Sequence, residues 1–176
     1  VVTGELTQVD TRGGKVRGVT VTGAYGERSF STPQLLLCPG PYLQRAANLL
    51  DITLPVACER HVKVALRDVH SALPADAPLV CWMDSVNLPW SNDEREALGE
   101  DPRMAHLLKP FPAGVHGRPS GAPGQHFALM LWTYDIEPSE PVFPLEWDPH
   151  LPEIIVRGMS TMLPAMTRYF DPLPRM

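Results

Sequence analysis

Cysteine is scarce in this chain, and its spacing excludes two kinds of site. The three cysteines, Cys38, Cys58 and Cys81, are far apart and form no C-x-x-C pair. Neither a zinc site nor a disulfide framework is therefore predicted. Isolated cysteines in odd number are typical of buried, reduced thiols in a cytoplasmic protein, so the cytoplasm is the expected location.

Motifs that hold metals or catalyse hydrolysis are also missing. His106, His116 and His126 stand ten residues apart, which differs from the i, i+4 spacing that presents two ligands on one helix face. We predict no metal site and expect these histidines on the surface or in hydrogen bonds. The sequence has no G-x-S-x-G elbow, so nucleophilic hydrolysis has little support.

Basic residues are few and scattered, which argues against a nucleic-acid partner. The chain has 15 Lys and Arg residues against 20 Asp and Glu, a net charge of −5, whereas phosphate binding needs clustered cations. No apolar run approaches the roughly 20 residues of a membrane span. No basic segment followed by an apolar one opens the chain, so we expect neither a membrane partner nor a signal peptide.

Proline, by contrast, is abundant, with 20 residues among 176. This content predicts many short elements separated by extended connections. The length suits one ordinary domain or a part of a larger one. Because the first residue is Val1 rather than Met, and Val1 and Val2 already have the character of a strand, we expect the chain to be a segment of a longer polypeptide. The alternative is a processed start.

The first 32 residues predict a three-stranded antiparallel meander. A strand around Leu6 and Val9 ends at Gly13-Gly14, a pair that can adopt the positive φ of a tight turn. Residues 15–22 alternate between apolar and polar side chains, and residues 27–32 return as the third strand.

A strand-to-helix junction is expected next. Leu35–Leu37 is apolar on both faces, the pattern of a strand that is covered on both sides, and Pro39-Gly40 separates it from an amphipathic helix over 44–50. Small residues at such a junction can press their backbone against a nucleotide phosphate or ribose. The alternative is a plain turn in which Gly40 only permits the geometry.

The rest of the chain predicts a second, mostly antiparallel sheet with helices. Ser91 and Glu94 have the spacing of a capping box at the start of a short helix. Strands are expected over 60–67, 79–83 and 127–132, a Pro/Gly-rich loop over 110–126, and an amphipathic helix over 152–162. The predicted fold class is α+β.

Residues 1 to about 60 resemble the FAD-dependent oxidoreductases of the D-amino acid oxidase/glycine oxidase/sarcosine oxidase family. The match begins with Leu6-Thr7-Gln8-Val9, Gly14-Lys15-Val16-Arg17-Gly18-Val19 and a hairpin with Gly26. It continues through the expected strand Gln34–Leu37, the segment Cys38-Pro39-Gly40-Pro41-Tyr42 with its helix, and Leu54-Pro55-Val56. The resemblance implies that residues 1–55 are part of an FAD-binding domain. It also implies that residues 56–176 are a substrate-domain-like α+β region.

The resemblance assigns cofactor contacts by position. Leu6 would lie against the adenine side of FAD, and the backbone of Cys38, Pro39 and Gly40 would contact the cofactor. Tyr42 stands where the family often has an aromatic residue.

The implied reaction transfers a hydride from a C–H bond next to nitrogen, in a small-molecule amine or amino acid, to flavin N5. No catalytic acid or base is identified. Arg118, which lies in an Arg-Pro stretch similar to one in the family, is a candidate to bind a substrate carboxylate in a bidentate pair. Arg60 and His61 are further candidates for substrate binding, and contacts with local groups are the plainer alternative for all three.

Two segments of the family pattern are missing. The sequence has neither the G-x-G-x-x-G loop that holds the pyrophosphate nor the C-terminal segment that closes over the isoalloxazine. We therefore expect this chain to be incomplete and inactive alone. The alternative is a non-catalytic α+β module or partial gene product that binds no flavin. A third interpretation is a homo-oligomer in which another chain supplies the missing half.

Overall fold

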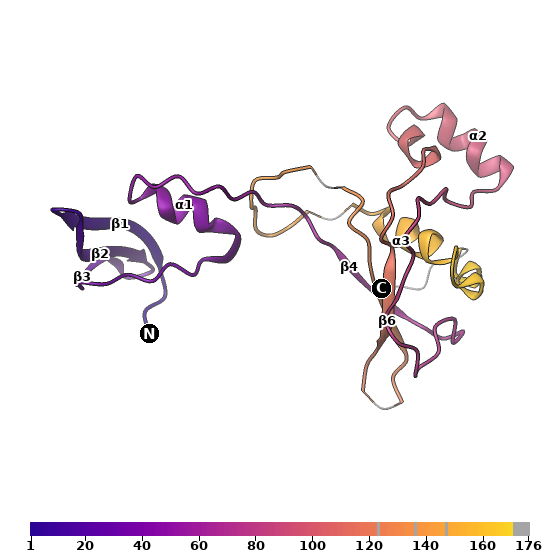
Figure 1. The fold of residues 1–176 in the computed structure, drawn as a ribbon, viewed down its shortest axis with the longest axis horizontal. Helices are drawn as coiled ribbons and strands as arrows, with labels where there is room; N and C mark the ends of the chain where they lie inside the picture. The colour runs from indigo at the N-terminus through magenta and orange to yellow at the C-terminus, as the bar shows by residue number, and fades with distance from the viewer. Residues whose placement is uncertain (123, 136, 147, 171–176) are drawn as a thin grey trace. The chain divides into compact units, whose positions relative to one another are not determined.

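The computed structural model describes residues 1–122, 124–135, 137–146 and 148–170. The chain divides into two units, and Figure 1 labels most of their helices and strands. The smaller unit comprises Val1–Cys58 and Pro138–Phe143, and the larger unit comprises Glu59–Glu137 and Pro144–Met176. Both contain antiparallel sheets with short helices, so the fold is α+β, as the sequence predicts.

The smaller unit contains the predicted meander. Strands β1 (Glu5–Arg12), β2 (Lys15–Gly23) and β3 (Gly26–Ser31) pair antiparallel in the order β1-β2-β3. The turn between β1 and β2 places Gly13 at φ 60° and Gly14 at φ 71°, and glycine adopts such angles without steric cost. The two-residue turn then sets the register of the hairpin.

The predicted strand at Leu35–Leu37 is wrong. These residues are not in a strand, and Leu36 is 86% exposed. A strand needs a neighbour to satisfy its N–H and C=O groups, and no described strand pairs with this segment. The predicted helix does form, as a 3-10 turn at Gly40–Tyr42 followed by α1 (Leu43–Asn48).

The larger unit is built on a four-stranded antiparallel sheet. Its order is β4 (Lys63–Arg67), β7 (Phe127–Leu131), β6 (His116–Ser120) and β5 (Val80–Cys81). Strand β6 lies inside the segment predicted as a loop. The sequence hid it because Gly117 and Pro119 are poor strand residues. Pro119 is tolerated because β5 pairs only with His116 and Gly117.

One face of this sheet is covered by the helix α3 (Leu151–Met159), which lies inside the predicted range except at its first residue. Ile155 and Met159 of α3 are fully buried, as are Leu66 and Met130 of the sheet. Gly117 permits close contact, because a Cβ at this position would lie 2.9 Å from Cε of Met159. The hydrophobic core of the larger unit is therefore between α3 and this face.

The predicted capping box is confirmed at the start of α2 (Asn92–Glu100). The backbone N–H of Glu94 donates to Oγ of Ser91 at 3.2 Å, and the N–H of Ser91 donates to Oε2 of Glu94 at 2.6 Å. Two N–H groups at the helix start are thereby satisfied. Two further 3-10 helices span Ala105–Leu108 and Pro164–Tyr169.

At Gly158, inside α3, even the methyl side chain of alanine is expected not to fit. Alanine at a helix interior usually stabilises by about 1 kcal/mol relative to glycine, but a Cβ here would lie 2.3 Å from Cζ3 of Trp132. Trp132 is 2% exposed and packs against the rings of Phe111 and Tyr134. Gly158→Ala should therefore lower the free energy of unfolding by about 1–3 kcal/mol, measured by urea denaturation followed by tryptophan fluorescence.

Gly99 provides the matched control for Gly158. It also lies in a helix, but the nearest atom to its Cβ position would be Cδ1 of Leu108 at an ordinary 3.9 Å. Gly99→Ala should leave stability unchanged or raise it slightly. Equal effects of the two substitutions would contradict the overpacking argument.

Candidate functional site

Two residues that the resemblance assigns to the cofactor lie in one hollow. This cavity, the β1–α1 hollow, has a volume of about 510 Å³ and belongs to the smaller unit. Its lining comes from the first strand, the 3-10 turn and α1: Glu5, Leu6, Thr7, Pro39, Tyr42, Arg45, Ala46 and Leu49. The fold thus brings Leu6 and Pro39, distant in the sequence, to the same surface.

The β1–α1 hollow has apolar and aromatic walls with a charged rim. Nη2 of Arg45 lies 2.5 Å from Oε1 of Glu5, and both side chains are largely exposed. An exposed ion pair of this kind contributes about 1 kcal/mol or less. Arg45 can therefore exchange Glu5 for an anionic ligand at little cost. The sequence does not predict a role for Arg45, because nothing in the local pattern around it shows that α1 faces β1.

The other two predicted cofactor residues do not line this hollow. Cys38 is exposed, and Gly40 stands beside Pro39 with φ at +60°. The positive φ explains the glycine as a conformational requirement of the turn. Cys58 is half-buried and Cys81 is exposed. The expectation of three buried thiols is therefore wrong, since the segments that carry these cysteines lie at the surface.

Arg118 lies on the side of the larger unit's sheet that faces away from α3, here called the open face. Residues directly opposite each other in antiparallel strands point to the same side. The cross-strand register defines three rows on this side: Lys63, Leu131 and His116; Ala65, Leu129 and Arg118; and Arg67, Phe127 and Ser120. Core residues occupy the alternate positions, so these nine side chains face away from α3.

The structure separates Arg60 from the other two predicted substrate residues. His61 contacts Thr133, which continues the β7 rows of the open face, with Nδ1 and Oγ1 3.4 Å apart. Arg60 instead lines a hollow with Val62 and Trp132, and its Nη2 lies 3.0 Å from Oδ2 of Asp135. His61 and Arg118 therefore belong to one side of the sheet, and Arg60 already has a partner elsewhere.

The hollow beside Arg60 is small, about 150 Å³, and rich in carboxylates. Tyr134 lies in its wall, and burial together with nearby Asp148 and Asp135 raises the pKa of its hydroxyl. The indole Nε1 of Trp132 donates to the carbonyl of Pro112 at 3.1 Å. The tyrosine therefore stays neutral at physiological pH and is not poised to act as a base.

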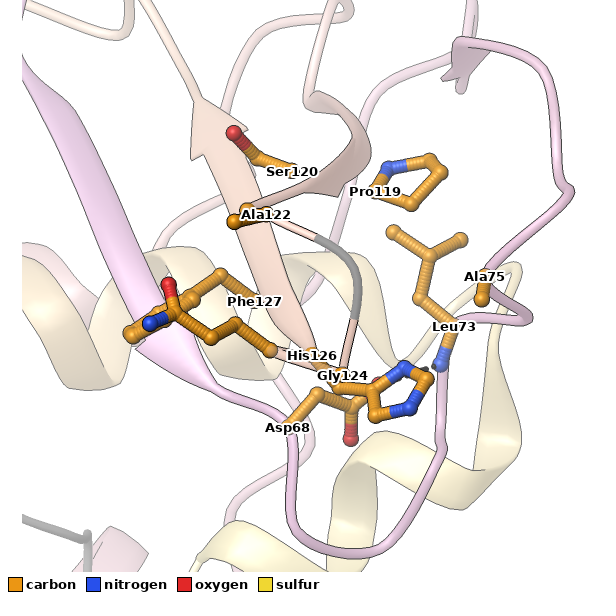
Figure 2. A pocket seen from close by; sticks show the side chains of 11 residues that line it. Asp68, Leu73, Ala75, Pro119, Ser120, Ala122, Gly124, His126 and Phe127 are labelled. Atoms are coloured by element: carbon orange, nitrogen blue, oxygen red, sulfur yellow. Dashed lines mark hydrogen bonds between the residues drawn. The ribbon is translucent and has the colours of Figure 1, made fainter.

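Figure 2 shows a third hollow, about 350 Å³, beside the hairpin between β6 and β7. Asp68 in its wall is 3% exposed. Its Oδ1 accepts from the N–H of Ala72 at 2.8 Å and from the hydroxyl of Tyr169 at 2.5 Å, and its Oδ2 accepts from the N–H of Leu73 at 2.8 Å. Both oxygens thus have partners, and the carboxylate is structural.

The pKa of the Tyr169 hydroxyl depends on its burial and on this hydrogen bond to Asp68. Burial, and then the hydrogen bond to Asp68, raises the pKa of Tyr169 to about 12. The hydroxyl also accepts the N–H of His70 at 2.8 Å. Asp68 and Tyr169 therefore connect the end of β4 to the C-terminal 3-10 helix.

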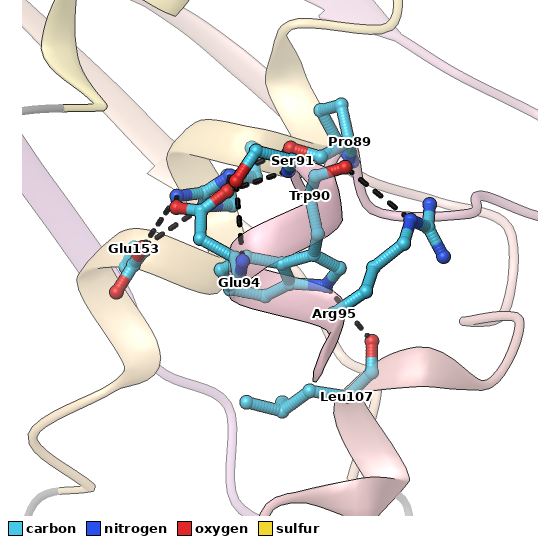
Figure 3. Close-up of polar contacts among 8 residues, drawn as sticks. Pro89, Trp90, Ser91, Glu94, Arg95, Leu107 and Glu153 are labelled. Atoms are coloured by element: carbon cyan, nitrogen blue, oxygen red, sulfur yellow. Dashed lines mark hydrogen bonds and ion pairs between the residues drawn. The ribbon is translucent and has the colours of Figure 1, made fainter. Parts of the chain in front are cut away.

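A polar cluster surrounds Arg157, which is 2% exposed. Figure 3 labels Glu94, Glu153 and Trp90, three members of this cluster. The guanidinium of Arg157 forms ion pairs with Glu94 and Glu153 and lies over the rings of Trp90 and Phe170, 3.8 and 4.5 Å from their centroids. Although burial opposes ionisation of Glu94, hydrogen bonds from Ser91 and Arg157 hold its pKa below the usual range. The charged side chains of this cluster therefore have their partners within it. These contacts join α2 to α3.

The described residues contain no group of three histidine, cysteine or carboxylate side chains that could hold a metal ion, and no helix among them is long and apolar enough to cross a membrane. His106 and His116 form hydrogen bonds through Nδ1 to the carbonyls of Arg103 and Gly114, both at 2.8 Å. The β1–α1 hollow and the open face carry the residues that the resemblance assigns to cofactor and substrate, apart from Cys38, Gly40 and Arg60. The chain matches no known family model, no curated protein and no solved structure.

Proposed function

We propose that the chain is part of an FAD-dependent oxidoreductase of the D-amino acid oxidase/glycine oxidase/sarcosine oxidase family that oxidises a small-molecule amine or amino acid. One observation supports this most. Leu6 and Pro39, assigned to the cofactor by the resemblance, line one hollow together with Tyr42. Its position between β1 and α1 gives the assigned residues a shared surface.

The residues of the β1–α1 hollow fit the adenosine half of FAD. Leu6, Pro39 and Tyr42 offer apolar and aromatic surface to a planar base, and Arg45 offers a cation to phosphate. No G-x-G-x-x-G loop is present to hold the pyrophosphate. The chain would therefore contribute part of the cofactor site and be inactive alone.

FAD, when bound, supplies the electron acceptor for oxidation of a C–H bond next to nitrogen. The residues of this chain would position the substrate. Arg118 and His61 lie on the open face, where Arg118 is exposed and able to bind a carboxylate. Arg60 remains a weaker candidate because Asp135 already pairs with it. The free cysteines favour a reducing compartment such as the cytoplasm.

The alternative is a non-catalytic α+β module that binds no flavin. The missing phosphate loop favours it, because the pyrophosphate charge would then have no glycine turn and helix N-terminus to bind. A yellow protein that retains FAD after gel filtration would support the flavoprotein. A colourless protein that takes up no added FAD would support the module.

Substitution of Leu6 tests where the cofactor binds. Leu6→Asn should weaken binding of both FAD and ADP about tenfold, because a leucine side chain contributes roughly 1.5 kcal/mol when its apolar surface is buried. FMN lacks the adenosine half and should be unaffected. Affinities are measured by isothermal titration calorimetry with each of the three compounds.

Leu79→Asn is the matched control, since Leu79 is a 57% exposed leucine of the larger unit. It should leave FAD binding unchanged. If FAD binds and Leu6→Asn has no more effect than Leu79→Asn, the β1–α1 hollow is not the adenosine site.

A further inference from the structure

Two sulfur atoms and one imidazole gather at the β5 edge of the larger unit's sheet. The row formed by Lys63, Leu131 and His116 continues onto β5, where Cys81 lies directly opposite His116. Side chains in such a pair point to the same side of the sheet. Met83 stands two residues after Cys81, and its Sδ lies 3.4 Å from Sγ of Cys81. The fold therefore brings a thiol, a thioether and an imidazole to one place.

The two sulfur atoms are close enough to bind one ion. A metal–thiolate bond is about 2.3 Å long, so two sulfurs on the same ion are at most about 4.6 Å apart. The observed 3.4 Å lies within this limit. Met83 is 74% exposed and Cys81 is exposed as well, so an ion can reach both from solvent. Their present contact is a weak hydrogen bond from the thiol, which a metal ion would replace.

The imidazole of His116 is oriented as in metal-binding histidines. Its Nδ1 lies 2.8 Å from the carbonyl oxygen of Gly114. Because a carbonyl oxygen only accepts, Nδ1 carries a proton, and the lone pair of the neutral ring is on Nε2. Histidines that bind metals usually donate their other ring N–H to a carbonyl or carboxylate in this way.

The backbone pairing also favours a short distance between His116 and Cys81. The N–H of Trp82 donates to the carbonyl of Val115 at 2.9 Å. The neighbouring pair, Cys81 and His116, is therefore of the non-hydrogen-bonded type, in which the Cα atoms are only about 4.5 Å apart and the side chains are closer.

We propose that Cys81, Met83 and His116 form a binding site for Cu(I). Thiolate and thioether ligands select this soft ion, and imidazole also suits copper, whereas structural zinc sites use four ligands and no thioether. Binding replaces the thiol proton by the metal ion, so one proton is released and the thiolate–Cu(I) unit is neutral. The site goes beyond the proposed function and needs no flavin.

The sequence predicts no metal site because the ligands come from separate segments. Cys81 and Met83 are neighbours in the chain, but His116 joins them only through the pairing of β5 with β6. The thioether is a ligand for few metals, so its presence beside Cys81 points to a soft ion in particular.

Competition for Cu(I) between the whole chain, without flavin, and the chelator bicinchoninate tests the proposal, with copper kept reduced by ascorbate under nitrogen. The chain should retain one Cu(I). Cys81→Ser, Met83→Leu and His116→Gln should each weaken binding at least about tenfold, because even groups that only orient a metal ligand contribute that much. X-ray absorption at the copper edge should show two sulfur neighbours and one nitrogen neighbour.

Cys38→Ser, Met162→Leu and His106→Gln are the matched controls and should leave Cu(I) binding unchanged. Cys38 is an exposed cysteine of the smaller unit, and Met162 is a half-buried methionine of the larger unit. His106 has the same hydrogen bond from Nδ1 to a carbonyl, on a 3-10 helix without cysteine. The amide NMR spectrum of each variant reports its folding.

Three results would overturn the proposal: equal losses of affinity in Cys38→Ser and Cys81→Ser, an affinity insensitive to both Met83→Leu and His116→Gln, or a copper spectrum with a single sulfur neighbour. Zn(II) should bind more weakly than Cu(I), and its affinity should not change in Met83→Leu. FAD uptake, measured separately, tests the flavoprotein assignment independently of these results.

Discussion

Replacing Arg157 with alanine is expected to lower the free energy of unfolding of the larger unit by about 3–5 kcal/mol. The substitution removes a buried cation that two carboxylates and two aromatic rings surround. It also leaves a cavity between α2 and α3. The carbonyl of Pro89 loses its hydrogen-bond donor, Nη1 of Arg157, which lies 2.6 Å away. Urea denaturation followed by tryptophan fluorescence measures the loss.

Tryptophan fluorescence reports this unit selectively, because all four tryptophans follow Glu59 in the sequence. Arg157→Met separates charge from packing. Methionine keeps much of the apolar volume between the rings of Trp90 and Phe170, and replacing a buried ion pair by apolar groups is often well tolerated. Its loss of stability should therefore be clearly smaller than that of alanine.

Arg103→Ala controls for the loss of an arginine as such. Its side chain is 87% exposed and pairs with Asp101, and exposed pairs contribute about 1 kcal/mol or less. If Arg157→Ala destabilises no more than Arg103→Ala, the cluster in Figure 3 does not hold α2 on α3.

Asp68→Ala is expected to have an effect of similar size, about 3–5 kcal/mol. The carboxylate accepts hydrogen bonds from two backbone N–H groups and from the hydroxyl of Tyr169. The carboxylate and the three donors are all buried. Each buried donor left without an acceptor costs about 1–3 kcal/mol. Urea denaturation again gives the free energy.

A spectroscopic readout distinguishes this mechanism from general damage. The hydrogen bond to Asp68 helps to raise the pKa of Tyr169 to about 12, so ultraviolet titration of Asp68→Ala should find this tyrosine ionising at lower pH. Asp76→Ala, at an exposed aspartate, should change stability by less than about 0.5 kcal/mol. An unchanged titration of Tyr169 in Asp68→Ala would contradict the assigned hydrogen bond.

Local signals predicted much of the fold. The glycine pair at Gly13-Gly14 and the alternation of residues 15–22 indicate the hairpin, because a two-residue turn and a period-two pattern involve near neighbours alone. Ser91 and Glu94 likewise satisfy each other within one helical turn. Such features depend on few long-range contacts, so reading them needs no knowledge of the whole molecule.

The errors arose where a segment depends on distant partners. Leu35–Leu37 has the composition of a buried strand but lies outside any described strand, since no neighbour pairs with it. Strand β6 has the composition of a loop but forms a strand, because β7 supplies its ladder over the full length His116–Ser120. Strand formation is decided by the neighbour as much as by the segment itself.

The sequence by itself determined the α+β class, the meander and the helix capped by Ser91, because these follow from turn chemistry, periodicity and capping. Tertiary structure alone decided which residues share a surface. It placed Leu6 and Pro39 in one hollow, put Arg118 on the open face and buried Arg157 between two rings. Such groupings come from contacts between residues far apart in the chain, and no local pattern encodes them.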